Sequence, residues 1–80
     1  MRAYVFLETK TGKAKRVARS LSSLTLQSAR VLSVDTVTGP YDIIAVLEGI
    51  DMDKMGRVIA EDIQKLDGVE KTMSSFAFYA

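Results

Sequence analysis

Residues 37–49 read VTGPYDIIAVLEG, and this stretch contains the interruption that decides how the chain folds. A β-branched run stops at Gly39-Pro40, Tyr41 and Asp42 follow, and an almost wholly apolar run then resumes. Glycine and proline together favour a stiff turn. The segment therefore predicts two strands, residues 30–37 (RVLSVDTV) and 42–49 (DIIAVLEG), joined by a short connection.

The segment that precedes these strands predicts a strand followed by a helix. Residues 2–9 (RAYVFLET) form a short run of β-branched and aromatic residues, which is typical of a strand. We expect Thr11 to cap a helix over residues 12–24, because apolar residues recur there at helical spacing and bases lie outside their stripe. The apolar residues of that stripe are Ala14, Val17, Ala18, Leu21 and Leu24.

The segment that follows them predicts a second helix and a last strand. Asp51 is expected to cap the helix and Gly68 to follow its C-terminal end. Asp53–Arg57 and Glu61–Lys65 are spaced as i,i+4 ion pairs. Residues 69–80 (VEKTMSSFAFYA) predict the last strand. The apolar positions of the helix are Met52, Met55, Val58, Ile59, Ile63 and Leu66.

The order β-α-β-β-α-β predicts a single domain over residues 1–80 with an α+β, ferredoxin-like fold. In that fold four antiparallel strands form one sheet and both helices cover one face. The uncovered face should then alternate to polar residues, but Tyr4, Phe6, Ile44 and Val46 keep it apolar. On the last strand we expect Met73, Ala77 and Tyr79 on one side and Phe76 and Phe78 on the other.

An uncovered apolar face predicts self-association. It would expose several hundred Å² of apolar surface, more than a stable monomer usually tolerates. The simplest cover is the same face of a second copy, which gives a dimeric α/β-barrel type of assembly. Small size supports this expectation, because an 80-residue domain without cysteine has no disulfide to stabilise it.

Composition excludes several functions. The chain has no cysteine and no histidine, so it lacks a thiol nucleophile, thiolate metal ligands and the usual general base at neutral pH. We expect no catalysis, no cofactor and no metal site. The chain contains 48% apolar and 26% charged residues, which is an ordinary composition for a globular protein. No run reaches the length of a membrane span or a signal peptide, so a cytoplasmic location is expected.

Charge is unevenly distributed along the chain. Residues 1–30 hold seven bases and one acid, a net of +6, whereas residues 31–80 hold four bases and nine acids, a net of −5. The asymmetry is compatible with a basic surface that binds nucleic acid. A solvent-exposed basic helix face, balanced by acidic residues nearby in the fold, explains it as well. The basic stretch 13–19 lacks the interleaved aromatic residues of single-strand binders, so no direct nucleic-acid binding is expected.

Three motifs carry a resemblance to a known family. These are the V-T-G-x-Y-D turn at residues 37–42, a G-V-x-x-T-x-S pattern that begins at Gly68, and a G-K-A helix start at Gly12. The chain resembles the RAM (regulation of amino-acid metabolism) domain of Lrp/AsnC regulators over nearly its whole length. The resemblance implies a dimer formed by sheet-to-sheet packing, assembled further into an octamer or decamer, with amino acids bound between subunits. The DNA-binding half of those regulators is absent, so we expect a stand-alone RAM domain that partners full-length Lrp/AsnC regulators.

The resemblance places the ligand near the turn and the last strand. An amino acid needs an acceptor for its ammonium group, which Asp42 can supply, and donors for its carboxylate. Those donors are backbone amides around Gly39 and the hydroxyl groups of Thr72 and Ser74. Each residue also has a structural reading, since Gly39 suits any turn and Asp42 can bond nearby amides. The full candidate set is Thr38, Gly39, Tyr41, Asp42, Thr72 and Ser74.

Three alternative functions stay open from the sequence. The first is a structural, ring-forming interaction module without a ligand, in which the opposed charges of the two chain segments mediate contacts between dimers. The second is an ACT-type regulatory domain, which has the same strand order but binds its ligand near the first strand–helix loop, here Gly12. The third is a small enzyme of the dimeric α/β-barrel class, which commonly uses a histidine that this chain lacks.

Overall fold

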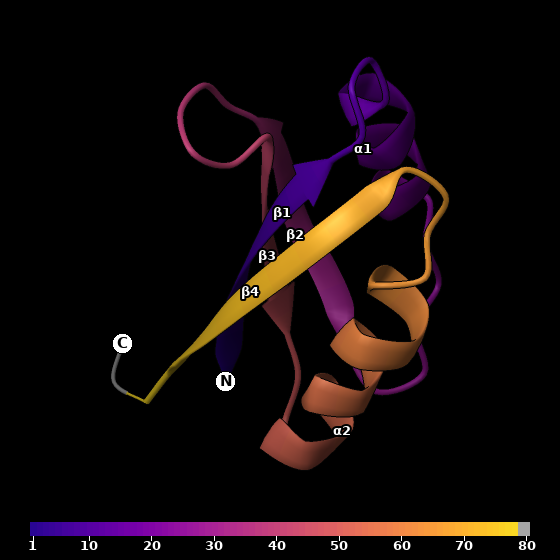
Figure 1. The fold of residues 1–80 in the computed structure, drawn as a ribbon. Helices are drawn as coiled ribbons and strands as arrows, with labels where there is room; N and C mark the ends of the chain where they lie inside the picture. Colours follow the sequence, from indigo (N-terminus) through magenta and orange to yellow (C-terminus); the bar gives the residue numbers. More distant parts are fainter. Residues whose placement is uncertain (79–80) are drawn as a thin grey trace.

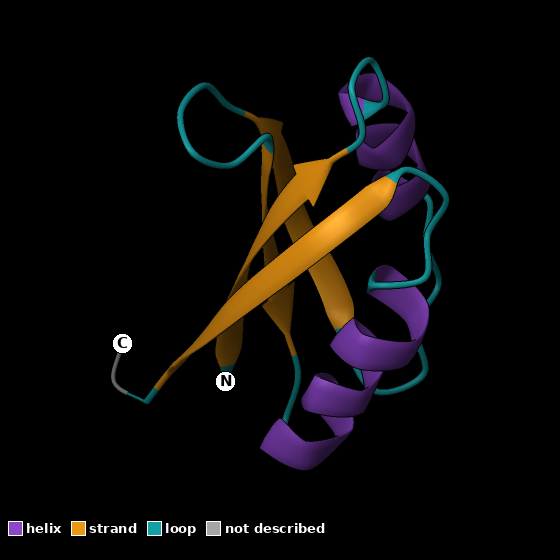
Figure 2. Ribbon diagram, viewed as in Figure 1, coloured by secondary structure: helices purple, strands orange, loops and turns teal. Residues whose placement is uncertain are grey.

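Two helices cover one side of an antiparallel sheet in the computed structural model, which describes residues 1–78 (Figure 1, Figure 2). The strands lie in the order β2-β3-β1-β4 and each neighbouring pair is antiparallel. This confirms the predicted ferredoxin-like fold. The elements are β1 (Arg2–Thr9), α1 (Ala14–Ser22), β2 (Arg30–Thr36), β3 (Ile43–Glu48), α2 (Met52–Val58), the π-helical turn η1 (Ile59–Ile63) and β4 (Val69–Ala77).

The core lies between the sheet and the helices. Alternate residues of the two central strands point at the helices and are fully buried, as strand geometry requires. The helices contribute Val17 and Leu21 from α1 and Met55 and Ile63 from the second helical segment, all with 0% exposure. The strand residues of this core are Ala3, Val5 and Leu7 on β1 and Ile43, Ala45 and Leu47 on β3.

The first helix begins two residues later than the sequence predicts. Thr11 and Gly12 form a turn after β1, in which the Lys13 amide donates to the Lys10 carbonyl at 2.9 Å. Lys13 therefore occupies the N-cap position, and no side chain caps the helix. The prediction of Thr11 as the cap is wrong because Thr11 lies within this turn and not at the N-cap position. The helix also ends at Ser22, two residues before the predicted end at residue 24.

The second helix begins as predicted but changes its winding halfway. Asp51 caps it, since its Oδ1 accepts from the Lys54 amide at 3.1 Å. Apolar residues four apart drift around an α-helix of 3.6 residues per turn. The wider turn of η1, in which the Gln64 amide donates to the Ile59 carbonyl at 2.9 Å, allows both Ile59 and Ile63 to face the core.

Two predictions for this region are wrong. The i,i+4 ion pairs do not form, because the ion pairs among residues 1–78 are Arg16–Asp67 at 3.6 Å and Arg30–Glu48 at 2.8 Å. Gly68 does not follow the helix end, since the helical winding stops at Ile63. Gly68 instead has a φ of +99° in the turn before β4, where a Cβ would lie 2.9 Å from the Val17 side chain.

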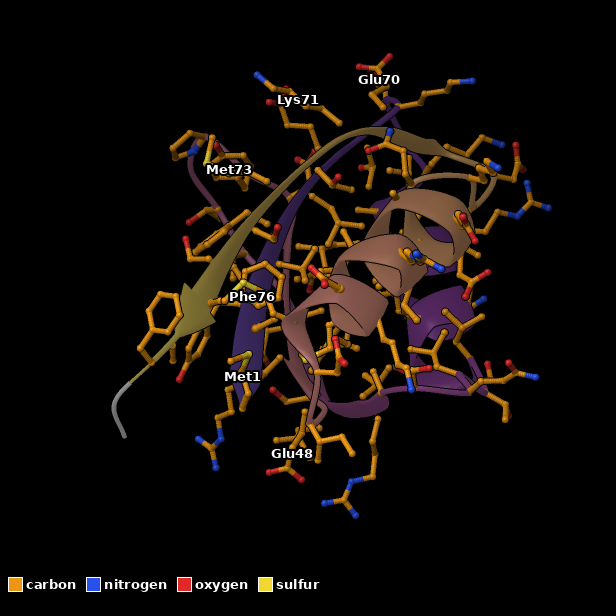
Figure 3. All side chains as sticks on the ribbon, turned by 90° about the horizontal axis from the view of Figure 1, so that it is seen from below. Met1, Glu48, Glu70, Lys71, Met73 and Phe76 are labelled. Atoms are coloured by element: carbon orange, nitrogen blue, oxygen red, sulfur yellow. The ribbon has the colours of Figure 1, made fainter. Side chains whose placement is uncertain are left out.

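The last strand has two different sides. Figure 3 shows Met73 on the side of β4 away from the helices and Phe76 on the side of α2. Phe76 packs against the core, whereas Met73 and Ala77 face away from it, as the pairing of Met73 with Phe6 requires. This confirms the predicted division for these residues. Phe78 is exposed just beyond the strand, and Tyr79 lies outside the described residues.

Candidate functional site

One face of the sheet has no covering element among the described residues. The helices lie on the other side, and the turn between β2 and β3 projects at one end (Figure 1). The register places Phe6 between Ile44 and Met73, and Tyr4 beside Val46. These five side chains are called the open face here. Four of them are half-buried, and Met73 is 48% exposed, so their apolar surface lies partly in water.

Tyr41 joins the turn to the open face. Its ring lies on Phe6, with ring centroids 5.4 Å apart and an interplanar angle of 47°. Its hydroxyl group donates to the Met73 sulfur at 3.4 Å. Tilted aromatic pairs and sulfur contacts of this kind are weakly stabilising. The turn residue thus contacts two strands of the open face, β1 and β4, that lie far from it in sequence.

Asp42 ties the turn to the end of β1. Its Oδ2 accepts from the Thr9 amide at 2.8 Å and from the Thr9 hydroxyl at 3.3 Å. Its own amide donates to the Leu7 carbonyl at 2.9 Å, and its carbonyl accepts from the Val37 amide at 2.9 Å. The other carboxylate oxygen, Oδ1, forms no hydrogen bond to a described residue. Asp42 therefore has a structural role and still has acceptor capacity.

The tip of the turn is open to solvent. Thr38, Gly39 and Pro40 are all exposed. Gly39 has a φ of +121°, which L side chains rarely adopt, and no heavy atom lies within 4 Å of the position its Cβ would take. Backbone strain, rather than lack of space, is therefore the reason for glycine here. Thr36, Val37 and Thr38 line a shallow hollow beside the tip.

Thr72 and Ser74 lie on the opposite side of the sheet from Tyr41. They pair with Leu7 and Val5, whose side chains face the helices. The Thr72 hydroxyl donates to Gln64 Oε1 at 2.6 Å, and Ser74 is exposed. The structure therefore brings Tyr41 and Asp42 together at the turn, while the two hydroxyl residues of β4 do not share a surface with Tyr41 within one chain.

Thr9, Phe6 and Met73 are site residues that the sequence did not single out. Thr9 holds the carboxylate of Asp42, although 33 residues separate the two. Phe6 and Met73 form the surface on which Tyr41 lies. Only the strand register could have identified these contacts, because nothing in the local pattern of either segment indicates the other.

Two classes of feature are absent from the part of the chain that the structure describes. No group of three or more Asp and Glu side chains in residues 1–78 is placed to hold a metal ion. None of the helices in this range is long and apolar enough to cross a membrane.

Solved structures with the same fold come from several organisms. TTHA0845 from Thermus thermophilus is 29% identical with a TM-score of 0.86, and the alignment covers 99% of this chain and 94% of that one. AsnC from E. coli is 19% identical with a TM-score of 0.86, covering 99% of this chain and 51% of that one.

A third similar structure contains an amino acid. The transcriptional regulator NMB0573 from Neisseria meningitidis, solved as a complex with L-Met, is 21% identical with a TM-score of 0.81. The alignment covers 98% of this chain and 49% of that one. This chain thus spans about half the length of AsnC and of NMB0573. No match was found among curated proteins.

The family assignment comes from a sequence model. The model of the Lrp/AsnC ligand binding domain matches residues 2–80, which is nearly the whole chain. The motifs at the turn and at the start of β4 lie within the matched range. Together with the ferredoxin-like sheet and its open face, this match shows that the chain belongs to the Lrp/AsnC ligand-binding domain family.

Proposed function

We propose that this domain is a stand-alone effector-binding and oligomerisation module of the Lrp/AsnC type. It binds a small metabolite, an amino acid, between subunits and modulates full-length Lrp/AsnC regulators in the cytoplasm, without catalysis and without binding DNA itself. The observation that carries the proposal is Tyr41, because it belongs to the turn and also packs on the open face. Ligand at the turn and subunit packing at the sheet are therefore linked by one side chain.

The dimer forms through the open face. Aromatic, β-branched and thioether side chains lie there side by side, half-exposed, on three neighbouring strands. Burial of apolar area contributes about 25 cal/mol per Å², and a two-fold axis lets each copy supply the cover that the other needs. The same dimers assemble further into an octamer or decamer through other surfaces.

The amino acid binds at the turn of one subunit beside the last strand of another. Asp42 is held by Thr9 through Oδ2, so Oδ1 accepts from the ligand's ammonium group. The exposed tip at Thr38 and Gly39 offers backbone amides to the carboxylate. Thr72 and Ser74 lie on the other side of the sheet, so in this proposal they are contributed by a neighbouring subunit. The L-Met complex of NMB0573 supports an amino acid as the ligand class.

A ligand-free structural module is the second candidate. It is favoured by the bonds that Asp42 and Thr72 already make within the chain, to Thr9 and Gln64 respectively. In that case these residues hold the turn and β4 in place, and the assembly is indifferent to metabolites. An ACT-type domain differs from both, because its ligand would lie near the exposed Gly12.

Native mass spectrometry together with thermal unfolding tests the proposal. We expect a multiple of two subunits and a higher melting temperature with millimolar concentrations of at least one amino acid, because ligand at 100 times its Kd adds about 2.7 kcal/mol to the free energy of unfolding. Asp42→Asn should abolish the ligand shift while the subunit number stays unchanged. Thr11→Val, beside Gly12 in the same exposed loop, is the matched control, since the φ of +78° at Gly12 would strain a valine there, and loss of the shift in that variant alone would favour the ACT-type site.

An unchanged melting temperature with all twenty amino acids, from a protein that still forms dimers, would favour the structural module. A monomer of 8.8 kDa at micromolar concentration would contradict both candidates.

A further inference from the structure

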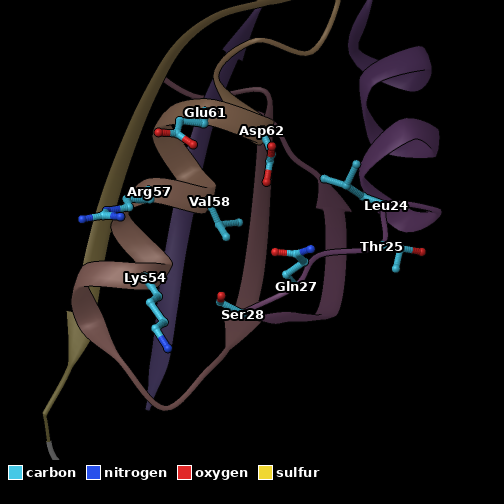
Figure 4. A pocket seen from close by; sticks show the side chains of 9 residues that line it. All are labelled: Leu24, Thr25, Gln27, Ser28, Lys54, Arg57, Val58, Glu61 and Asp62. Atoms are coloured by element: carbon cyan, nitrogen blue, oxygen red, sulfur yellow. The ribbon is translucent and has the colours of Figure 1, made fainter.

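A second hollow lies on the helical side of the molecule, far from the turn in the fold. It is a cleft of about 680 Å³ between the second helical segment and the loop that follows α1. Figure 4 shows its two walls, with α2 and η1 on one side and the loop of residues 24–28 on the other. Its lining residues are Leu24, Thr25, Gln27, Ser28, Lys54, Arg57, Val58, Glu61 and Asp62.

The helical wall of the cleft has a charge at each end and an apolar centre. Lys54, Val58 and Asp62 follow one another at intervals of four residues, and the wide turn of η1 keeps the last of them in line with the first two. In Figure 4 Val58 and Asp62 point toward the 24–28 loop and Lys54 extends toward the lower end of the cleft. Arg57 and Glu61 also line the cleft, although their side chains point away from the loop. Leu24 and the amide of Gln27 face the helical wall from the loop.

The charged groups at the two ends are not neutralised by each other or by a neighbour. Lys54 and Asp62 are exposed, and neither takes part in an ion pair within 4.0 Å among the described residues. Eight residues separate them along a segment that is partly α-helix and partly π-helix, so at a rise of at most 1.5 Å per residue their Cα atoms lie no more than about 12 Å apart along the axis. The cleft therefore has an unpaired cation toward one end and an unpaired anion toward the other, with Leu24 and the largely buried Val58 between them.

We propose that this cleft binds a short peptide through its two free termini. Lys54 binds the terminal carboxylate, Asp62 binds the terminal ammonium group, and Gln27 bonds the peptide backbone between them. A central apolar side chain packs on Leu24 and Val58. An extended tripeptide, at about 3.3 Å per residue, has a length comparable to the spacing of the Lys54 and Asp62 Cα atoms along the helix.

The spacing of Lys54 and Asp62 along the helix favours a ligand longer than a single amino acid, whose ammonium and carboxylate groups are attached to the same Cα atom. The site is thus distinct in position and in ligand length from the turn, and it does not rest on the function proposed above. A concave wall also favours a small ligand over the convex helix of a second copy.

Titration calorimetry of the whole chain with the tripeptide Ala-Leu-Ala tests the proposal. Lys54→Gln and Asp62→Asn should each weaken binding about tenfold, the loss expected for one exposed charge-assisted contact. Acetylation of the peptide's amino terminus or amidation of its carboxyl terminus should weaken binding by a similar factor. Lys65→Gln and Asp53→Asn are matched controls, because both residues are exposed near the same helical segment and neither lines the cleft, and they should leave the affinity within about twofold.

Several results would overturn the peptide site. These are the absence of binding at about 10 mM peptide, equal affinity for the capped peptides, or equal losses in the Lys65 and Asp53 controls. A lower subunit number for Lys54→Gln or Asp62→Asn in native mass spectrometry would assign the cleft to a second copy instead. Asp42→Asn should leave tripeptide binding unchanged, which separates this test from that of the turn.

Discussion

The two faces of the sheet are built from the same kinds of residue but lie in different surroundings. On the face toward the helices, Val5, Leu7 and Leu47 have no exposed surface. On the open face, Phe6 and Val46 are adjacent to them in sequence and equally apolar, yet they are only half-buried. Local sequence therefore distinguishes the faces poorly, and the difference arises from which face the helices cover. An apolar residue has its full effect on stability only where something packs against it.

The largest effect is expected from the face toward the helices. Leu7→Ala leaves a cavity where no surface is exposed, and such changes typically lower the free energy of unfolding by about 2–5 kcal/mol. That is a large share of the stability of so small a domain. Urea unfolding followed by circular dichroism, at one fixed protein concentration, measures the change. A loss below about 1 kcal/mol would contradict the assignment of Leu7 to a tightly packed core.

A charge on the open face should affect association rather than folding. Val46→Asp leaves the core residues in place, so the circular dichroism spectrum should be retained. In the proposed dimer the new carboxylate would be buried unpaired between two sheets, which opposes association. We expect the dimer dissociation constant to rise at least about a hundredfold, or 2.7 kcal/mol, as measured by sedimentation velocity.

The control for this variant is Ser22→Asp, which adds the same charge at an exposed position on α1. It should leave the dissociation constant unchanged. If Val46→Asp dimerises as tightly as the unaltered protein, the open face is not the interface.

The comparison also shows what can be predicted from the sequence. The order of the elements, the Asp51 cap and the two apolar faces are all predictable, because each depends on residues close together in the chain. The start of α1 is not, because a turn at Thr11 competes with capping, and the π turn of η1 is not, because only packing of Ile63 requires it.

The candidate site is predictable only in part. The motif identifies the turn, and the structure places Tyr41 and Asp42 there together. The partners of these residues are not predictable, because Thr9 and Met73 reach them through strand pairing over more than thirty residues of sequence. The cleft at Lys54 and Asp62 escapes prediction for a related reason: it exists because the loop after α1 lies across from the second helix.

The smallest effect is expected at the residue that joins the open face to the turn. Tyr41→Phe keeps the ring on Phe6 and removes only the hydroxyl bond to the Met73 sulfur, which is a weak acceptor. We expect a loss of about 0.5 kcal/mol or less in the free energy of unfolding.

Tyr41→Ala removes the ring as well, and should weaken the dimer and the amino-acid response together, because the same side chain contacts both regions. Sedimentation and thermal unfolding of the two variants, measured side by side, check this. If Tyr41→Ala changes dimerisation but leaves the ligand shift intact, the open face and the turn act independently, and the link that Tyr41 makes between them is only one of contact.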